Sequence, residues 1–509
     1  MTSESNMNRR EFLAPAAAGL AFSLVPRHVL GGPGYVAPSD KLTLAYIGCG
    51  TQGIRELLRL VANPEVQIIA VCDPVKDGTN YVDWDKTGIR DSVRKTLEDP
   101  TWGEGVPGIR AGRDMAKEII SAYYAKKRSS ESYSGCSSYA DFRELLEKEG
   151  DLDAVKIMTP DHLHATIAVA AMKKGKHVVM HKPLANRVSE ARLVVDTARQ
   201  TGKATHLLAW HGPLTAVREM LLDGAIGTLR EIHNWTDRPL WPQALNPPRD
   251  TPPVPEGFDW KLWLGPSLDR PYHPSYTHAV FRGWYEFGGG SIADMGNYSL
   301  WPIFMALDLP LPISIEAQAS FSCEIVDQVS GIAANDFAFP YANRVHFRFP
   351  AHGNWPALSL YWYDGGMRPF TRAELAEDSR AMPNAGTLFV GDKGLILNNR
   401  IVPEKNMQEY RASKPDLAEQ PKRPRGAAAD AAWVQAFKGG PASPGHFLNA
   451  ANCAETIALA AVAIRVSRKS FPENDLPPLQ WDAQNMKVTN IPEANQYLYR
   501  EYREGWKLL

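Results

Sequence analysis

Three glycines and one aspartate have the types and spacing that could bind a dinucleotide. Gly48, Gly50 and Gly53 follow an apolar run, and the chain continues with apolar residues at helical spacing. Such a strand–turn–helix lets the backbone approach a pyrophosphate, and the helix start offers unpaired N–H groups. Asp73 ends the next apolar run, about 20 residues further on, where dinucleotide sites place the acid that binds the ribose hydroxyls. The pattern predicts a dinucleotide site.

The residues around this turn also favour one dinucleotide over another. A carboxylate at position 73 repels a 2′-phosphate, and the next residue is Pro74 rather than an arginine. We therefore expect NAD, with NADP disfavoured. The cofactor contacts expected from this region are Gly48, Gly50, Thr51, Gln52, Gly53 and Asp73.

Two more polar stretches follow apolar strands in an alternation of strands and helices. These are Thr159–His164 and His181–Pro183. The alternation predicts a doubly wound parallel sheet with right-handed crossovers, whose ligands bind at the carboxyl ends of the strands. All these junctions should therefore converge on one crevice. From them we expect Thr159, Pro160, His162, His164 and Lys182 to contact the cofactor.

Lys182 is the strongest candidate for chemistry, because it precedes a proline at the ligand end of the sheet. Desolvation and a positive nicotinamide ring would both lower its pKa. The lysine could then act as a base, or as a cation that acidifies a substrate hydroxyl. The alternative is a surface lysine on a loop. For His181 the sequence leaves two roles open, one in the chemistry and one as a hydrogen-bonding support of its neighbours.

Asp294 and Tyr298 form a second candidate pair. They are four residues apart on a predicted helix that runs to Leu307, so they share a face. Gly288–Gly290 precede them and would let the helix start approach a ligand. A tyrosine beside Lys182 makes a workable proton relay, because a nearby cation lowers the pKa of a phenol. The alternative is a capping aspartate and a packed tyrosine.

A proline- and tryptophan-rich segment over residues 238–284 is too long for an ordinary connection and too aromatic for disorder. Aromatic faces suit the C–H faces of sugar rings. The alternative is a lid that packs on the sheet without touching a ligand. The substrate contacts expected here and just before it are His211, Trp241, Trp284 and Tyr285.

Together the glycine turn, the Thr-Pro-Asp-His-Leu-His segment at 159–164 and the Lys-Pro after a Gly-Lys-His-Val-Val strand resemble the Gfo/Idh/MocA oxidoreductases. The resemblance implies a Rossmann domain followed by an open, mostly antiparallel sheet domain. It implies a lysine beside the nicotinamide, with Asp294 and Tyr298 meeting the substrate hydroxyl from the other side. His181 departs from the family's usual glutamate, and Tyr298 resembles the glucose–fructose oxidoreductase branch.

The resemblance further implies an NAD-dependent oxidoreductase that transfers a hydride between a sugar or glycoside carbinol and nicotinamide. One alternative is a glycoside hydrolase that keeps NAD bound and oxidises the sugar transiently before elimination. Another is a non-catalytic carbohydrate-binding or sensor protein. The residues leave these three alternatives open.

The chain of 509 residues is long enough for two or three domains. We expect a signal and linker over 1–39, a Rossmann domain over 40–205, a substrate and oligomerisation domain over 206–445, and a helix and tail over 446–509. The formal net charge of −1 implies no nucleic acid partner. The five scattered cysteines lack metal-ligand spacing, so no metal is expected. An open sheet face favours a homo-oligomer.

Arg9 and Arg10 precede a short apolar stretch over residues 14–25. This is typical of a twin-arginine export signal, although a tail with a chance arginine pair would look the same. The stretch is too short to span a membrane and no cysteine for a lipid anchor follows it. We therefore expect an exported or periplasmic protein without a membrane span.

Overall fold

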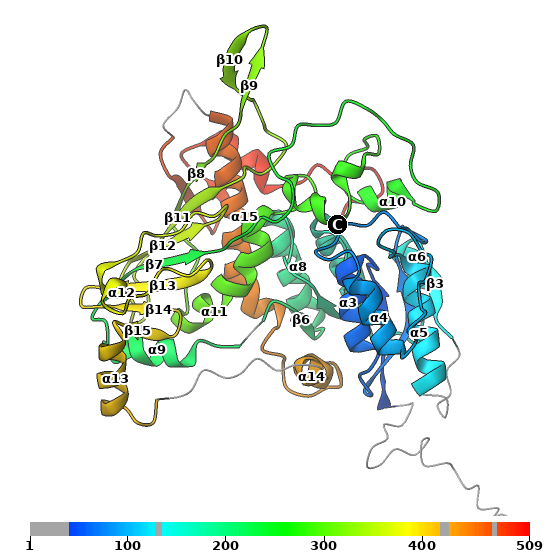
Figure 1. The fold of residues 1–509 in the computed structure, drawn as a ribbon, viewed down its shortest axis with the longest axis horizontal. Coiled ribbons are helices and arrows are strands. Elements are labelled where there is room, and N and C mark those ends of the chain that lie inside the picture. The colour runs from blue at the N-terminus through cyan, green and yellow to red at the C-terminus, as the bar shows by residue number, and fades with distance from the viewer. Residues whose placement is uncertain (1–39, 128–134, 211, 418–426, 471–475, 509) are drawn as a thin grey trace, which may run out of the picture.

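The computed structural model describes residues 40–127, 135–210, 212–417, 427–470 and 476–508 (Figure 1). The predicted export signal and His211 lie outside these residues.

The first domain contains a six-stranded parallel sheet in the order β3-β2-β1-β4-β5-β6. Its strands are mostly buried on both faces, which explains their continuous apolar runs. The doubly wound parallel sheet predicted from the sequence is therefore confirmed. The strands are β1 (Leu42–Ile47), β2 (Val66–Cys72), β3 (Ser137–Tyr139), β4 (Ala154–Ile157), β5 (His177–Met180) and β6 (Thr205–Leu207).

Helices cover both faces of this sheet (Figure 1). One face packs against α3 (Thr51–Leu60), α4 (Gly88–Leu97), α5 (Arg113–Lys127) and the later α14 (Ala427–Phe437). The other packs against α6 (Phe142–Lys148), α7 (Asp161–Lys173) and α8 (Val188–Thr201).

Three details differ from the sequence prediction. The sequence predicts a helix over residues 139–147, but Tyr139 ends a short edge strand and the helix begins at Phe142. It predicts another over residues 165–174, but α7 begins earlier, at Asp161, and the polar residues of its first turn are buried. The strand β6 reaches Leu207, beyond the predicted boundary at 205.

The second domain is built on a nine-stranded sheet in the order β15-β14-β13-β7-β12-β11-β8-β16-β17. Every neighbouring pair is antiparallel except β12 and β7. The mostly antiparallel second sheet is thus confirmed. Its strands are β7 (Leu229–Trp235), β8 (Ser314–Ala319), β11 (Asn343–Phe349), β12 (Leu358–Tyr363), β13 (Gly386–Gly391), β14 (Leu395–Leu397), β15 (Arg400–Val402), β16 (Leu479–Asp482) and β17 (Lys487–Val488).

One face of this sheet is covered and the other is open. Alternate residues of β11 and β12 are buried towards α11 (Asn297–Leu307) and α15 (Phe447–Ser470), while the intervening ones are partly or fully exposed. The remaining helices are α9 (Thr215–Leu222), α10 (Trp260–Leu264), α12 (Ala373–Glu377) and α13 (Glu404–Ser413). A hairpin of β9 (Cys323–Val326) and β10 (Val329–Ile332) projects from the body (Figure 1).

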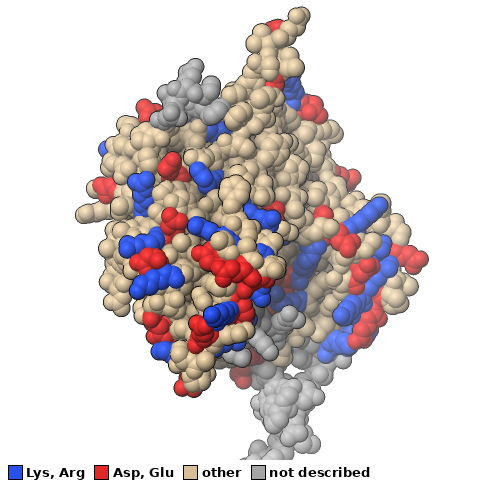
Figure 2. All heavy atoms as spheres, turned by 60° about the vertical axis from the view of Figure 1, so that its left-hand side comes forward, with Lys and Arg blue, Asp and Glu red and all other residues tan. Residues whose placement is uncertain are grey.

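The stretch Phe447–Lys469 of α15 is long and apolar enough to cross a membrane by length and composition. However, 72% of its most apolar window is buried inside the structure, between α8, α11 and β8. Burial of this kind is what a core helix requires, so its composition has an explanation within the fold. The charged side chains on the face drawn in Figure 2 are of both signs and interspersed.

Candidate active site

The residues predicted to do chemistry meet at a cavity of about 260 Å³ at the carboxyl ends of the parallel strands. Both domains contribute to its wall. Twelve of the residues predicted for the site line it: Gly48, Gly50, Thr51, Gln52, Gly53, Asp73, Thr159, Pro160, His181, Lys182, Asp294 and Tyr298.

The glycine turn has the geometry that dinucleotide binding requires. Gly48 has a φ of +99°, and a Cβ there would lie 2.5 Å from the backbone of Met158. A Cβ on Gly53 would lie 2.3 Å from the carbonyl oxygen of Gly48, so this glycine lets helix and strand pack. The start of α3 has no side-chain cap and no acidic residue in its first turn. Its N–H groups are therefore suited to an anionic ligand such as a pyrophosphate.

Asp73 is held rigidly at the edge of the same cavity. Its two carboxylate oxygens accept the N–H groups of Cys49 (2.6 Å) and Val75 (2.8 Å). Burial raises the pKa of Asp73 to about 6 although these hydrogen bonds oppose the shift. The carboxylate is therefore charged at neutral pH and can accept hydrogen bonds from the hydroxyl groups of a ribose.

Thr159 presents a further group that fits a dinucleotide. Its hydroxyl is buried at the cavity wall and has no hydrogen-bond partner among the residues that the structure describes. A buried hydroxyl without a partner is costly, so a ligand with a polar group at this point would stabilise it.

Lys182 and Asp294 form a buried ion pair at the other end of the cavity. The ammonium donates to Oδ1 of Asp294, and Nε of Arg282 donates to the same oxygen at 3.1 Å. Burial lowers the pKa of Lys182, with Arg282 adding to the effect and Asp294 opposing it. The direction is the one expected from the sequence. Asp294 keeps a pKa below its usual range, since the two cations outweigh its burial.

Tyr298 lies beside this pair and contacts His181. The Tyr298 hydroxyl and Nε2 of His181 are 3.2 Å apart, and the Lys182 ammonium lies 5.2 Å from the centre of the tyrosine ring. Burial lowers the pKa of His181 well below its usual value, and the neighbouring Lys182 and Arg282 lower it further. A neutral His181 can therefore accept the hydroxyl hydrogen of Tyr298 when the ring carries its own hydrogen on Nδ1.

The helix that carries Asp294 and Tyr298 begins differently from the prediction. Residues Ile292–Gly296 form a π-helical turn, and α11 follows from Asn297 to Leu307. The glycines before it serve the protein's own packing, because a Cβ on Gly288 would lie 2.5 Å from Cα of Arg282. Gly290 similarly admits the ring of Phe339, which a Cβ would meet at 2.7 Å. These glycines do not line the cavity themselves, but they bring Arg282 and Asp294 together, and the helix start at Asp294 and Met295 lines the cavity.

Two predicted cofactor contacts, His162 and His164, do not line the cavity. They lie in the first turn of α7 and are fully buried. Nε2 of His162 bonds the carbonyl of Trp263 at 2.9 Å. The ring of His164 lies between the carbonyls of Pro183 (2.6 Å) and Thr159 (2.9 Å), and burial lowers its pKa. Both rings fasten the walls of the site together.

The predicted substrate contacts also lie away from the cavity wall, and His211 is outside the described residues. Trp241 is buried behind Arg282, whose guanidinium lies 5.8 Å from its ring. Trp284 donates to the carbonyl of Ser275 within an aromatic cluster, and Tyr285 packs on Phe339. These aromatic residues pack against other parts of the protein, which agrees with the alternative that the segment is a lid whose aromatic residues do not touch a ligand.

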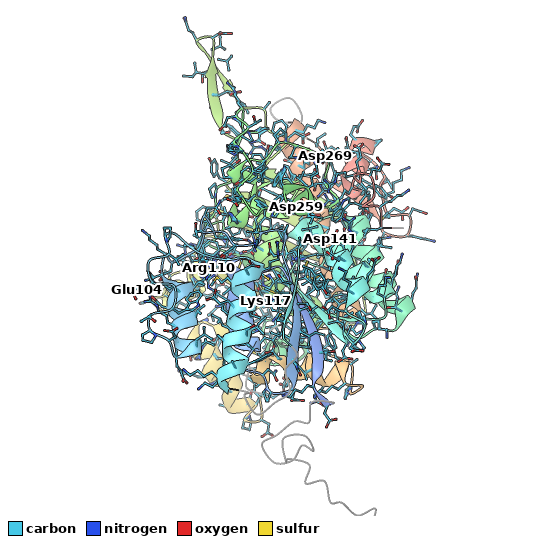
Figure 3. All side chains as sticks on the ribbon, turned by 90° about the vertical axis from the view of Figure 1, so that its right-hand side faces the viewer. Glu104, Arg110, Lys117, Asp141, Asp259 and Asp269 are labelled. Carbon is cyan, nitrogen blue, oxygen red and sulfur yellow. The ribbon has the colours of Figure 1, made fainter. Side chains whose placement is uncertain are left out.

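That lid is fastened to the Rossmann domain. Phe258 forms a bridge with Val75, and the N–H of Asp259 donates to the carbonyl of Pro74 at 3.0 Å. Figure 3 shows Asp259 above the Rossmann helices. The side chain of Asp259 caps α10, where Trp263 reaches the cavity wall. The segment thus closes the site with one aromatic residue from α10.

Several residues that line the cavity were not predicted. On the Rossmann side they include Arg55 of α3 and residues 81–84 of the insertion between β2 and β3. In this insertion Tyr81 packs on His278 with ring centres 4.0 Å apart. From the second domain Arg238 and Arg282 reach the same cavity. Among the described residues, no group of three or more His, Cys, Asp or Glu side chains could hold a metal ion.

Two family models match the chain. Residues 109–208 match the NAD-binding Rossmann fold of the Gfo/Idh/MocA oxidoreductase family, and residues 233–332 match its C-terminal alpha/beta domain. Each of the two domains thus contains a segment that is similar to the corresponding domain of this family. These matches support the resemblance seen in the sequence. The matched segments include Lys182, Asp294 and Tyr298.

Curated relatives match more narrowly. The chain is 36% identical over 117 residues to dTDP-3,4-didehydro-2,6-dideoxy-alpha-D-glucose 3-reductase of Streptomyces violaceoruber, covering 22% of this chain and 34% of the relative. It is 28% identical over 200 residues to a Glycosyl hydrolase family 109 protein of Solibacter usitatus, covering 39% and 37%. It is 31% identical over 115 residues to levoglucosan dehydrogenase of Pseudarthrobacter phenanthrenivorans, covering 21% and 29%. The matches span about a third of the length of these relatives.

Among solved structures, levoglucosan dehydrogenase in complex with NADH and levoglucosan is 16% identical, with a TM-score of 0.47 over 84% of this chain and 97% of that one. The WlbA dehydrogenase from Chromobacterium violaceum in complex with NADH and UDP-GlcNAcA is 13% identical, with a TM-score of 0.47. The match covers 85% of this chain and 94% of that one.

Proposed function

We propose that the protein is an NAD-dependent oxidoreductase that transfers a hydride between a carbinol carbon of a sugar or glycoside and nicotinamide. The observation that supports it is the meeting of two sets of residues in one cavity. The glycine turn, Asp73 and the unpartnered Thr159 hydroxyl suit the dinucleotide, while Lys182, Asp294, Tyr298 and His181 suit proton chemistry. The Asp73 carboxylate favours NAD over NADP by repelling a 2′-phosphate.

When bound, the cofactor would accept or return the hydride. The task of the chain is to place a hydroxyl and to move its proton. The Lys182 ammonium, fixed by Asp294, points at the cavity and stabilises the negative charge that develops on the substrate oxygen. Arg282 donates to the same oxygen of the Asp294 carboxylate, so two cations fix Asp294.

Tyr298 and His181 provide the route for the proton. The Tyr298 hydroxyl takes the substrate proton while it passes its own hydrogen to Nε2 of His181. The lowered pKa of His181 keeps the ring neutral before the step, and it also makes the protonated ring short-lived, so His181 passes the proton on to solvent rather than keeping it. His181 thus takes a chemical place in the proposal, where the family usually has a glutamate.

The test uses purified protein loaded with NAD. A panel of aldoses, polyols and glycosides is screened for NADH absorbance and for a ketosugar by mass spectrometry. NADH and ketosugar formed in equal amounts support the proposal. Absence of both products across the panel, with NAD demonstrably bound, refutes it. Absence of released free sugar as well favours a carbohydrate-binding or sensor protein.

A second candidate is a glycoside hydrolase that uses bound NAD by transient oxidation and elimination. It is favoured by the matches to Glycosyl hydrolase family 109 proteins, which cover 39% of this chain. The same panel separates the two functions by stoichiometry. Free sugar released without net NADH indicates the hydrolase, whereas lasting NADH with an intact glycosidic bond indicates the dehydrogenase.

We also propose export through the twin-arginine route, as Arg9 and Arg10 suggest. Residues 1–45 fused to a reporter should be exported, and Arg9→Lys with Arg10→Lys should retain the fusion in the cytoplasm. Equal export of both fusions would contradict this.

Association of copies through the open sheet face is proposed on the half-exposed side chains of His346, Tyr361 and Tyr363. Light scattering should report more than one copy per particle at micromolar concentration. Arg344→Glu and Tyr361→Lys, both on the open sheet face, should shift the mass towards the monomer, and an unchanged mass would contradict the assignment.

A further inference from the structure

Two arginines lie at the Lys182 end of the cavity, and the proposed hydride transfer uses only the hydrogen bond from Nε of Arg282 to Asp294. Arg282 comes from the 3-10 turn His278–Gly283, and Arg238 comes from the loop after β7. Neither segment is near the other in sequence, yet both side chains line the cavity that Lys182 and Asp294 line. The fold therefore brings three cations and the Asp294 carboxylate to this wall, and the buried Asp161 carboxylate interacts electrostatically with Arg282 and Lys182 from behind it.

The side chain of Arg282 is held in place by its neighbours, while its two terminal nitrogens remain available to a ligand. Its Nε donates to Asp294 at 3.1 Å, and its guanidinium rests 4.6 Å from the ring of Phe281 and 5.8 Å from that of Trp241. Gly288 leaves room for its backbone, as described above. Among the described residues, no protein acceptor bonds its Nη1 or Nη2. Two terminal nitrogens held rigidly at a cavity wall present the fork that binds carboxylate and phosphate groups.

Arg238, in the loop after β7 of the same domain, supplies the second cation. Its carbonyl accepts the N–H of Gly365 at 2.7 Å, which fixes the loop to the end of β12. Its Nη1 contacts Asp237 at 2.6 Å, but that carboxylate is 51% exposed. An ion pair with an exposed carboxylate contributes little free energy, so the Arg238 guanidinium can bind an anion in the cavity instead.

The phosphates of the cofactor are not the natural partners of these arginines. The start of α3 offers its N–H groups to a pyrophosphate, and the arginine at that end, Arg55, is paired with Asp83 at 2.5 Å. Arg282, by contrast, shares its acceptor with Lys182. Oxidised NAD would add another positive charge to this end of the site. An anion on the substrate would offset the excess.

We propose that the substrate is an anionic sugar, whose carboxylate or phosphate is bound by Arg282 and Arg238 while its hydroxyl faces Lys182 and Tyr298. The proposal rests on the oxidoreductase function proposed above and specifies its substrate class. A carboxylate and a phosphate share the chemistry that a guanidinium recognises, and the experiment distinguishes them.

The experiment compares three probes of similar size on the NAD-loaded protein: methyl β-D-glucuronide, glucose 6-phosphate and methyl β-D-glucoside. Calorimetry measures their affinity and NADH absorbance measures turnover. At least one anionic probe should bind about 10- to 100-fold more tightly than the neutral one, the range expected for charge-assisted hydrogen bonds. The stronger of the two anions identifies the group.

Variants locate the effect. Arg238→Gln should raise Kd and KM for the anionic probe by about tenfold or more and leave those for the neutral probe unchanged. Arg282→Gln should do the same and also lower kcat for both probes, since it loosens Asp294. Arg348→Gln, an exposed arginine on β11, is the control and should change neither.

Equal affinity for neutral and anionic probes, or an equal effect of Arg238→Gln on both, overturns the inference. Turnover of neutral sugars alone would also overturn it while leaving the oxidoreductase function intact. Binding of an anionic probe that depends on Arg238 but never yields NADH or ketosugar upholds the subsite and refutes the oxidoreductase function.

Discussion

Replacing Lys182 by methionine tests the proposed chemistry most sharply. The side chain is 4% exposed and its ammonium is the group that would stabilise charge on the substrate oxygen. A positioned acid, base or charge of this kind contributes roughly 10²- to 10⁴-fold to a rate. This corresponds to about 2.7 to 5.4 kcal/mol of transition-state stabilisation. Single-turnover measurements of NADH formation should show this loss, and NAD affinity by calorimetry should be unchanged.

The same substitution also disturbs folding, and the structure suggests how to separate the two effects. Breaking a buried ion pair costs about 3 to 5 kcal/mol when the remaining charge has no partner. Here Arg282 stays 3.1 Å from Asp294, so we expect a smaller loss. The double variant Lys182→Met with Asp294→Asn removes both charges and should recover stability but not activity.

A matched control is Lys156→Met. Lys156 is another buried lysine of the same sheet, paired with Glu56 at 3.3 Å, and it does not line the cavity. It should lower stability without a comparable loss in the single-turnover rate. Retention of more than half of the wild-type rate by Lys182→Met would remove this lysine from the mechanism.

Three further outcomes follow from the site and its surroundings. Tyr298→Phe should lower kcat by about 10²- to 10⁴-fold at unchanged NAD affinity in stopped-flow and binding experiments, and an unaltered kcat would exclude its hydroxyl from the proton route. Because the pKa of Asp73 is raised to about 6, NAD should bind most tightly above pH 6 and more weakly as pH falls through 6. Asp73→Asn should weaken NAD binding about tenfold or more at neutral pH and abolish that pH dependence in calorimetry, and a parallel profile would count against its role. Burial lowers the pKa of His206 to about 3, below the value of about 6.5 expected in the unfolded chain. The stability this histidine confers is thus complete above pH 6.5 and lost as pH falls towards 3, so urea titrations of His206→Gln should show a shallower acid loss than wild type, and identical slopes would contradict this.

The sequence pattern was sufficient to predict the site residues that follow a strand or lie on a helix. The glycine turn, Asp73 and Lys182 each follow an apolar strand, and parallel strands bring their carboxyl ends to one edge by topology alone. Asp294 and Tyr298 were placed by helical spacing, which survived the π-helical turn between them. For these residues, the sequence pattern that predicts the position is also the feature that places the side chain in the cavity.

The remaining wall depends on packing between segments that are distant in the chain. Arg282 reaches Asp294 only because Gly288 admits its backbone, and nothing in the spacing of the residues reports that contact. Tyr81 meets His278 across the two domains for the same reason. Conversely, His162 and His164 have the types of ligand-binding residues, but α7 begins early and buries both rings against carbonyl groups. Residue type alone could not distinguish such a structural histidine from a binding one.

A crystal structure of the protein grown with NAD tests the central claim most directly. The account predicts the pyrophosphate against the N–H groups of residues 50–53, the ribose hydroxyls on Asp73, and the nicotinamide ring beside the amine of Lys182. A dinucleotide bound outside this cavity, or a nicotinamide ring remote from Lys182, would contradict it.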